Sequence, residues 1–206
     1  MIWKVTQKIR GSSLIAYILA FSGWVVYLIQ AWIYAHIQTS FLDEGGYLYI
    51  GDLYSRGIIR PFQDYGTIRQ YAPLSYLIPG QIEAWFGASL HTGRFFSLFC
   101  GLMLIIALWI IARRLGGNWM GAAVVWGMAL TPISIQIYTL AISEALVACL
   151  LAWSLLFVLG EKQKLWQIIT GSFLTGLVVM TRQNLIIVIP LLLAYIFWQH
   201  GKKAGF

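Results

Sequence analysis

Apolar residues dominate long stretches of this chain, and these stretches constrain its fold more than any other feature. The first, Leu14–Ala35, has 22 residues with Gln30 as its main polar exception. At about 1.5 Å per residue, a helix of that length reaches about 33 Å, which is enough to cross a bilayer. Five further runs follow along the chain: Thr92–Ala112, Trp119–Tyr138, Ala145–Leu159, Leu165–Thr181 and Leu185–Trp198.

The composition excludes a soluble globule. Hydrophobic residues make up 60% of the 206 and charged residues only 10%, whereas a soluble domain usually has a charged fraction of about a quarter. We therefore expect an all-α integral membrane protein with about six transmembrane helices. The last three runs are short for full spans, so tilt, bilayer thinning or a re-entrant hairpin at Arg182-Gln183-Asn184 remain alternatives for them.

The positions of the basic residues predict the orientation. Nine of the fourteen Lys and Arg residues lie in connections that six alternating spans place on one side, and that side is the cytoplasmic one by the positive-inside rule. The N-terminus is thus expected in the cytoplasm, with the chain in the cell (inner or plasma) membrane. The net charge of +7 is spread over membrane flanks, which argues against nucleic acid as a partner. The four connections are Met1–Arg10, Arg113-Arg114, Glu161–Lys164 and Lys202-Lys203.

The loop from His36 to His91 is then outside and holds five of the seven acidic residues. A helix from Asp43 to Gly57 would carry an apolar stripe, and a second helix is expected from Pro73 to Phe86, ended by Gly87. Both are amphipathic, and we expect them to lie in the membrane interface. The first stripe comprises Tyr47, Ile50, Leu53 and Tyr54.

The acidic pair Asp43-Glu44 opens the first of these helices. On a helical wheel Asp43 projects beside the Tyr47 stripe toward the lipid boundary, while Glu44 turns toward water. A carboxylate at that boundary could deprotonate an acceptor beside a lipid-linked reactant. The alternative is that Asp43 is an N-cap and Glu44 an early-turn acid favoured by the helix dipole, with no chemistry.

Two further charges are expected on the same face of the membrane. Glu144 precedes the fourth span, and Arg182 lies in the turn between the fifth and sixth runs. Carboxylates and an arginine at one membrane face suit an enzyme that deprotonates an acceptor and holds a phosphate. Alternatively, Glu144 is an interfacial cap and Arg182 a snorkelling side chain.

The acidic pair Asp43-Glu44 belongs to a series of short motifs that resembles the N-terminal half of the GT-C type membrane glycosyltransferases that use polyprenyl-phosphate sugars. The family includes the protein mannosyltransferases and the aminoarabinose transferases, and is similar to glycosyltransferase family 39. The motifs, in order, are Leu42-Asp43-Glu44-Gly45-Gly46-Tyr47-Leu48-Tyr49, Ser55-Arg56-Gly57, Asp64-Tyr65, Ala72-Pro73-Leu74-Ser75-Tyr76, Trp85-Phe86-Gly87, Gly93-Arg94 and Ala112-Arg113-Arg114-Leu115-Gly116-Gly117.

The resemblance implies a role for each candidate residue. Asp43 would be the catalytic base, supported by Glu44. A divalent metal is possible in some branches of the family, with Asp43 and Glu144 as its ligands here, and no other cofactor is implied. The implied substrate-binding residues are Glu144, Arg182, Arg94, Arg69 and Tyr76, with the arginines holding phosphate.

The implied reaction is inverting transfer of a sugar from an undecaprenyl or dolichyl phosphate carrier to a glycan, lipid or protein acceptor at the outer face of the membrane. Residues 1–206 would form a single membrane-embedded catalytic module. Family members have about twice this length, so we expect the family's C-terminal half to be missing, either because the chain is a fragment or because it is a short form that needs a partner. The alternatives are a transporter or channel subunit and a non-catalytic protein that binds the lipid carrier.

Overall fold

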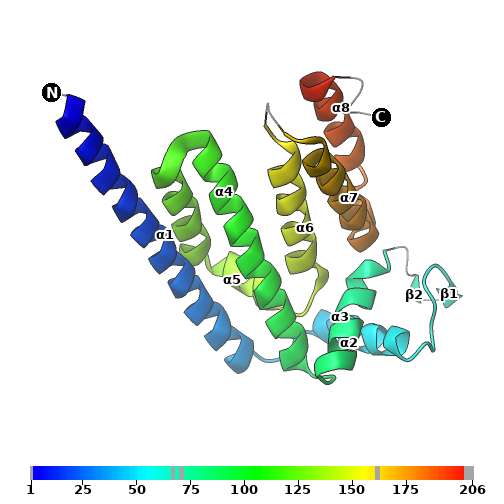
Figure 1. Ribbon diagram of the computed structural model, residues 1–206. Coiled ribbons are helices and arrows are strands. Elements are labelled where there is room, and N and C mark those ends of the chain that lie inside the picture. Colours follow the sequence, from blue (N-terminus) through cyan, green and yellow to red (C-terminus); the bar gives the residue numbers. More distant parts are fainter. Residues whose placement is uncertain (1, 66–67, 70–71, 161–162, 202–206) are drawn as a thin grey trace.

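The computed structural model describes residues 2–65, 68–69, 72–160 and 163–201, without the side chains of residues 2–12, 42, 64–65 and 68–69. In this part of the chain the protein is helical apart from one short antiparallel hairpin, in which Asp64 pairs with Arg69 and Tyr65 with Ile68. The elements are α1 (Ile2–Ile37), α2 (Leu42–Ser55), β1 (Asp64–Tyr65), β2 (Ile68–Arg69), α3 (Leu74–Phe86), α4 (Leu90–Leu130), α5 (Pro132–Thr139), α6 (Ser143–Val158), α7 (Leu165–Thr181), the 3₁₀ turn η1 (Gln183–Leu185) and α8 (Val188–His200) (Figure 1).

Helix α4 reverses direction and forms two antiparallel arms beside α1 (Figure 1). The reversal lies at Gly116 and Gly117, and the φ of +78° at Gly117 favours glycine over any residue with a Cβ. Tyr27 and small residues of α1 pack against both arms, and such small residues let helix backbones approach closely. The packed residues are Ala20, Tyr27 and Ala31 of α1 with Leu98, Leu102, Ile105, Ala122, Val125 and Ala129 of α4.

Helices α6 and α7 form a second packed pair. Ser154 of α6 donates a hydrogen bond to the carbonyl of Gly171 (2.8 Å) and shares another with Thr175 (2.6 Å). A Cβ at Gly171 would lie only 2.5 Å from Val158, so the helices need glycine at this position. Buried hydroxyl pairs and small residues are typical of contacts between transmembrane helices.

Three helices in the described part of the chain are long and apolar enough to cross a membrane, and a fourth span results if α5 and α6, bent by 104°, are taken together. The prediction of a helical membrane protein is confirmed, whereas six separate spans are not. The predicted run Trp119–Tyr138, for example, is divided between the second arm of α4 and helix α5. Large apolar side chains are exposed along the helices, including Phe21, Leu130 and Trp198, as a lipid environment requires.

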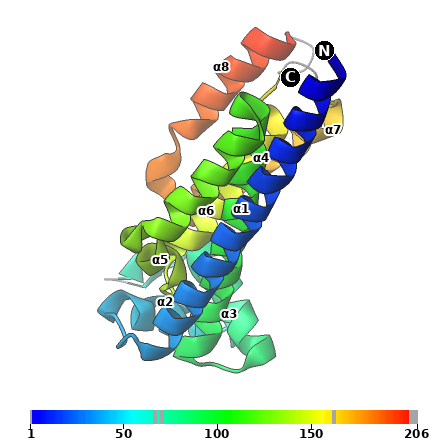
Figure 2. The same ribbon diagram turned by 90° about the vertical axis from the view of Figure 1, so that its left-hand side faces the viewer.

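Helices α2 and α3 lie together at one end of the bundle, and the reversal of α4 lies at the other (Figures 1 and 2). Their bounds agree with the two expected helices of the loop, and Gly87 with a φ of +94° follows α3 as predicted. Their placement in a membrane interface remains a prediction. It is consistent with the strong exposure of Trp85 and Phe86 of α3.

The polar side of α3 faces inward because α2 and α3 cross at two glycines. A Cβ on Gly80 would lie 2.1 Å from the carbonyl oxygen of Gly51. Near this crossing Glu83 is buried, and its Oε2 has no hydrogen-bond partner within the described residues. Burial, together with the nearby negative charge of Asp52, raises the pKa of Glu83 to about 7.

We predict that Gly80→Ala separates α2 from α3 and destabilises the protein. The atoms that a new Cβ would meet belong to the backbone of Gly51 and cannot rotate away, so overpacking should cost about 1–3 kcal/mol. The measurement is the apparent melting temperature of the detergent-solubilised protein. Gly127→Ala in α4 is the matched control, because a Cβ there has open space, and equal melting temperatures for the two variants would contradict the proposed crossing.

Candidate active site

Helix α2 begins with a turn that is closed by Glu44. The backbone N–H of Phe41, the N-cap residue, donates to Glu44 Oε2 at 2.9 Å, and the N–H of Glu44 donates back to the Phe41 carbonyl at 3.1 Å. The acid at the third helical position thus performs the capping. The alternative interpretation of Asp43 as the N-cap is wrong, since Asp43 lies inside the helix.

Glu44 is fully buried and forms an ion pair with Arg94 of α4, which is 1% exposed. Arg94 Nε and Nη2 donate to the two carboxylate oxygens at 2.8 and 2.7 Å. The other N–H groups of Arg94 donate to three backbone carbonyls at the end of α1, so all five donors of the guanidinium are used. These carbonyls are those of Ala35 (3.0 Å), Gln38 (2.7 Å) and Thr39 (3.0 Å).

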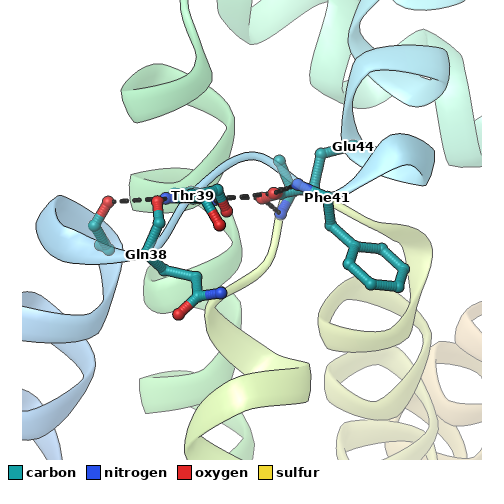
Figure 3. A network of polar contacts seen from close by, with 7 residues as sticks. Gln38, Thr39, Phe41 and Glu44 are labelled. Atoms are coloured by element: carbon teal, nitrogen blue, oxygen red, sulfur yellow. Dashed lines mark hydrogen bonds and ion pairs between the residues drawn. The ribbon is translucent and has the colours of Figure 1, made fainter.

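The remaining acceptor sites of Glu44 are also filled. Figure 3 shows Phe41 and Glu44 together with Gln38 and Thr39, whose carbonyls accept hydrogen bonds from Arg94. The Glu44 carboxylate also accepts a hydrogen bond from the N–H of Phe41 and one, at 2.8 Å, from the N–H of Ala141. Burial alone would raise the pKa of Glu44, but hydrogen bonds from Arg94, Ala141 and Phe41 outweigh it and hold that pKa below its usual value. The prediction that Glu44 turns toward water is therefore wrong, because a partner fifty residues further along the chain draws it inward.

Asp43, by contrast, is exposed and makes no hydrogen bond or ion pair with the described residues. It lies at the edge of a pocket of about 780 Å³ on the surface of α2, as expected from its position beside the Tyr47 stripe. Tyr76 of α3 also lines this pocket and stacks on Tyr47, with 5.1 Å between the ring centroids. The remaining lining residues are Gly45, Gly46, Tyr49 and Ile50.

A hydrogen bond connects this pocket to the start of α6. The hydroxyls of Tyr47 and Ser143 are 3.1 Å apart, and Ser143 is the first residue of α6. The next residue, Glu144, forms an ion pair with Arg182 at the end of α7. Both side chains are about one third exposed, so the structure brings together two of the charges that were expected to share one membrane face.

The structure places no free binding group at the other predicted site residues that it describes. Arg94 has no N–H left for a phosphate in this structure. Arg69 lies in β2, and its side chain is outside the described part. Within the described residues no three His, Cys, Asp or Glu side chains are close enough together to hold a metal ion. A divalent metal on Asp43 and Glu144 therefore stays a prediction.

The sequence reasoning missed the structural role of Arg94 and the contact between Tyr47 and Ser143. One signal was available for the first of these. Arg94 stands within two residues of the start of an apolar run, Thr92–Ala112, and Glu44 stands near the end of another. Because a charge beside a membrane segment requires a partner, the two could have been paired with each other.

The family described as dolichyl-phosphate-mannose-protein mannosyltransferase matches residues 71–205, which is well over half of the chain. The chain therefore belongs to this family of membrane glycosyltransferases, as its motifs indicated. No curated protein and no solved structure gives a significant match. The matched segment contains Tyr76, Arg94, Glu144 and Arg182 but begins after α2, so the match itself says nothing of Asp43.

We predict that Glu44→Gln acts on folding. The substitution leaves Arg94 buried without its counter-ion, and breaking such a pair costs about 3–5 kcal/mol. The variant should accumulate poorly in membranes and melt at a lower temperature in detergent. Because the pKa of Glu44 is lowered in the fold, its stabilisation is present above the usual pKa of about 4.5 and is lost as the pH falls through the lowered value.

The difference between wild type and Glu44→Gln should accordingly shrink in acid. Asp52→Asn on the same helix is the control, since the Arg56–Asp52 pair is exposed and such pairs contribute only about 0–1 kcal/mol. Normal accumulation and stability of Glu44→Gln at neutral pH would contradict the structural role.

Proposed function

We propose that this protein transfers a sugar from a polyprenyl phosphate carrier to an acceptor at the outer face of the cell membrane, with Asp43 as the general base. One observation carries the proposal. Of two adjacent carboxylates, Glu44 is fully engaged by Arg94, whereas Asp43 is exposed at a wide pocket and has no partner among the described residues. A base must be free to accept a proton, so only Asp43 is suited to that role.

The chemistry needs few groups because the donor carries its own leaving group. Asp43 takes the proton of an acceptor hydroxyl while the hydroxyl oxygen forms a bond to the anomeric carbon of the sugar. The bond between that carbon and the phosphate oxygen breaks, and the lipid phosphate leaves with the electron pair. Attack from the face opposite the phosphate inverts the anomeric centre. Stabilising the departing negative charge then requires a cation.

Arg182 is the proposed cation. Its ion pair with Glu144 is partly exposed, and Glu144 adjoins Ser143, which contacts the pocket residue Tyr47. We propose that the donor phosphate replaces Glu144 on the guanidinium, which can bind two phosphate oxygens at once. Tyr76 would then contact substrate from the opposite wall of the pocket, and Arg94 would hold α2 in position.

The proposed orientation has the N-terminus in the cytoplasm and the pocket outside. It is supported by the position of Arg113 and Arg114 near the reversal of α4, at the end of the bundle opposite α2 and α3 (Figure 1). The description of the family names mannose on dolichyl phosphate as donor and protein as acceptor. Polyprenyl phosphomannose is therefore the first donor to test, in membranes that contain the complete protein.

We predict that Asp43→Asn lowers the transfer rate by about 10²–10⁴-fold, as expected when a general base is lost. The amide matches the carboxylate in shape but accepts no proton. Asp43 has no partner among the described residues, so accumulation should be normal. The measurement is transfer of radiolabelled mannose per amount of protein in membranes. Asp52→Asn serves as the control for loss of a carboxylate from the same helix. A native transfer rate in the Asp43→Asn variant would exclude Asp43 as the base. If the wild type binds the donor but transfers no sugar, the protein is instead a non-catalytic carrier-binding protein.

Arg182 and Glu144 should respond in opposite ways. Arg182→Ala should weaken binding of polyprenyl phosphomannose about tenfold or more, because charge-assisted hydrogen bonds contribute about 1.5–3 kcal/mol. Arg182→Lys should be nearly as weak, since lysine lacks the planar fork. Glu144→Gln should strengthen binding by removing the competing carboxylate. Equal loss in Arg182→Ala and Glu144→Gln, measured by titration with the lipid donor, would show that the pair only ties α6 to α7.

A further inference from the structure

Gly45 and Gly46 of α2 stand out because no packing contact requires them. Both are exposed, and a Cβ added to either would find no atom within 4 Å. The other glycines of the outside helices have a structural reason, since Gly51 and Gly80 touch each other where α2 and α3 cross. Consecutive glycines inside a helix destabilise it relative to alanine. Two such residues without a packing partner therefore call for another explanation.

Both glycines line the pocket that carries Asp43. They form a part of its surface from which no side chain projects. The same pocket is lined by Asp43 and by Tyr49, which is 63% exposed. Tyr47 and Tyr76 form another part of the lining. The pocket thus offers a carboxylate, a bare helix surface and aromatic rings side by side.

We propose that the bare surface of Gly45 and Gly46 is the seat of a pyranose ring, so that these two residues determine how closely the sugar approaches Asp43. The inference rests on the proposed function and adds the residues that select its substrate. A pyranose has a flat face of C–H groups that packs on glycine backbone and on an aromatic ring such as Tyr49, and a rim of hydroxyls that a carboxylate can bind.

Other occupants fit less well. An extended peptide would need free backbone donors and acceptors, but the N–H and C=O groups inside a helix bond to one another. A hydrocarbon chain would not be placed beside an exposed carboxylate. The sugar could come from the lipid-linked donor or from a glycan acceptor, because the two present the same chemistry.

The test is a graded series at the bare surface. Gly45→Ala, Gly46→Ala and Gly46→Leu are compared with wild type in titrations with a short-chain polyprenyl phosphomannose, without acceptor. We expect affinity to fall with side-chain size, by about tenfold for Gly46→Leu. The melting temperatures of the alanine variants should be equal or higher, since alanine favours the helix. Loss of binding together with equal or higher stability excludes misfolding as the cause.

Gly127→Ala is the matched control, because it is the same change at another exposed helical glycine with open space around it. Tyr49→Leu is the second variant and should weaken the same titration by removing the ring. If donor binding is unchanged but the KM for a mannosyl glycan acceptor rises, the seated ring is that of the acceptor, which also supports the proposal. Wild-type donor binding and acceptor KM in all four pocket variants would overturn it.

The two proposals fail separately. If Asp43→Asn loses transfer while the glycine variants keep wild-type binding and kinetics, only the proposed role of Gly45 and Gly46 in binding the sugar is contradicted. A native transfer rate in Asp43→Asn removes the base but leaves the binding titration of the glycine variants as an independent measure of where the ring lies.

Discussion

The end of the bundle that carries α2 and α3 depends on one buried ion pair, Glu44 with Arg94. Arg94 extends from α4 and donates to the carbonyl of Ala35 in the last turn of α1 and to the carbonyls of Gln38 and Thr39, which follow that helix. Its positive charge also lies at the negative end of the α1 dipole. Glu44 caps α2 and holds the backbone of Ala141, which precedes α6. A single pair thus fixes the ends of four helices that are far apart in the sequence.

This arrangement gives two adjacent carboxylates opposite environments. Glu44 is ionised, saturated and buried, so it has no capacity left for chemistry. Because it faces inward, the helical rotation of about 100° per residue turns Asp43 outward, to the pocket with Tyr47 and Tyr76. The position of the proposed base is therefore a consequence of the ion pair. Assigning different roles to neighbouring acids by their environments is a general rule for paired carboxylates.

The features that could be predicted from the sequence are those set by local patterns. The bounds of α2, α3 and α7 agree with the expected segments to within about two residues, because apolar periodicity and the glycine after α3 are local signals. The burial of Glu44 could not be derived from a helical wheel, since a wheel assumes that charge faces water and ignores Arg94. The reversal at Gly116 and Gly117 separates two antiparallel arms, and the predicted run Trp119–Tyr138 continues from the second arm into α5.

The residues of the proposed site fall in two parts of the chain. The matched segment supplies Tyr76, Glu144 and Arg182, while α2, which carries Asp43 and the two bare glycines, lies before it. Contacts between the two parts include the Tyr47–Tyr76 stack, the hydrogen bond between Tyr47 and Ser143, and the ion pair of Glu44 with Arg94. Because the ion pair is saturated and buried, α2 has little freedom to rotate. Such a helix would hold the Asp43 carboxylate at a fixed position relative to Arg182, as the proposed base and the proposed phosphate-binding group require.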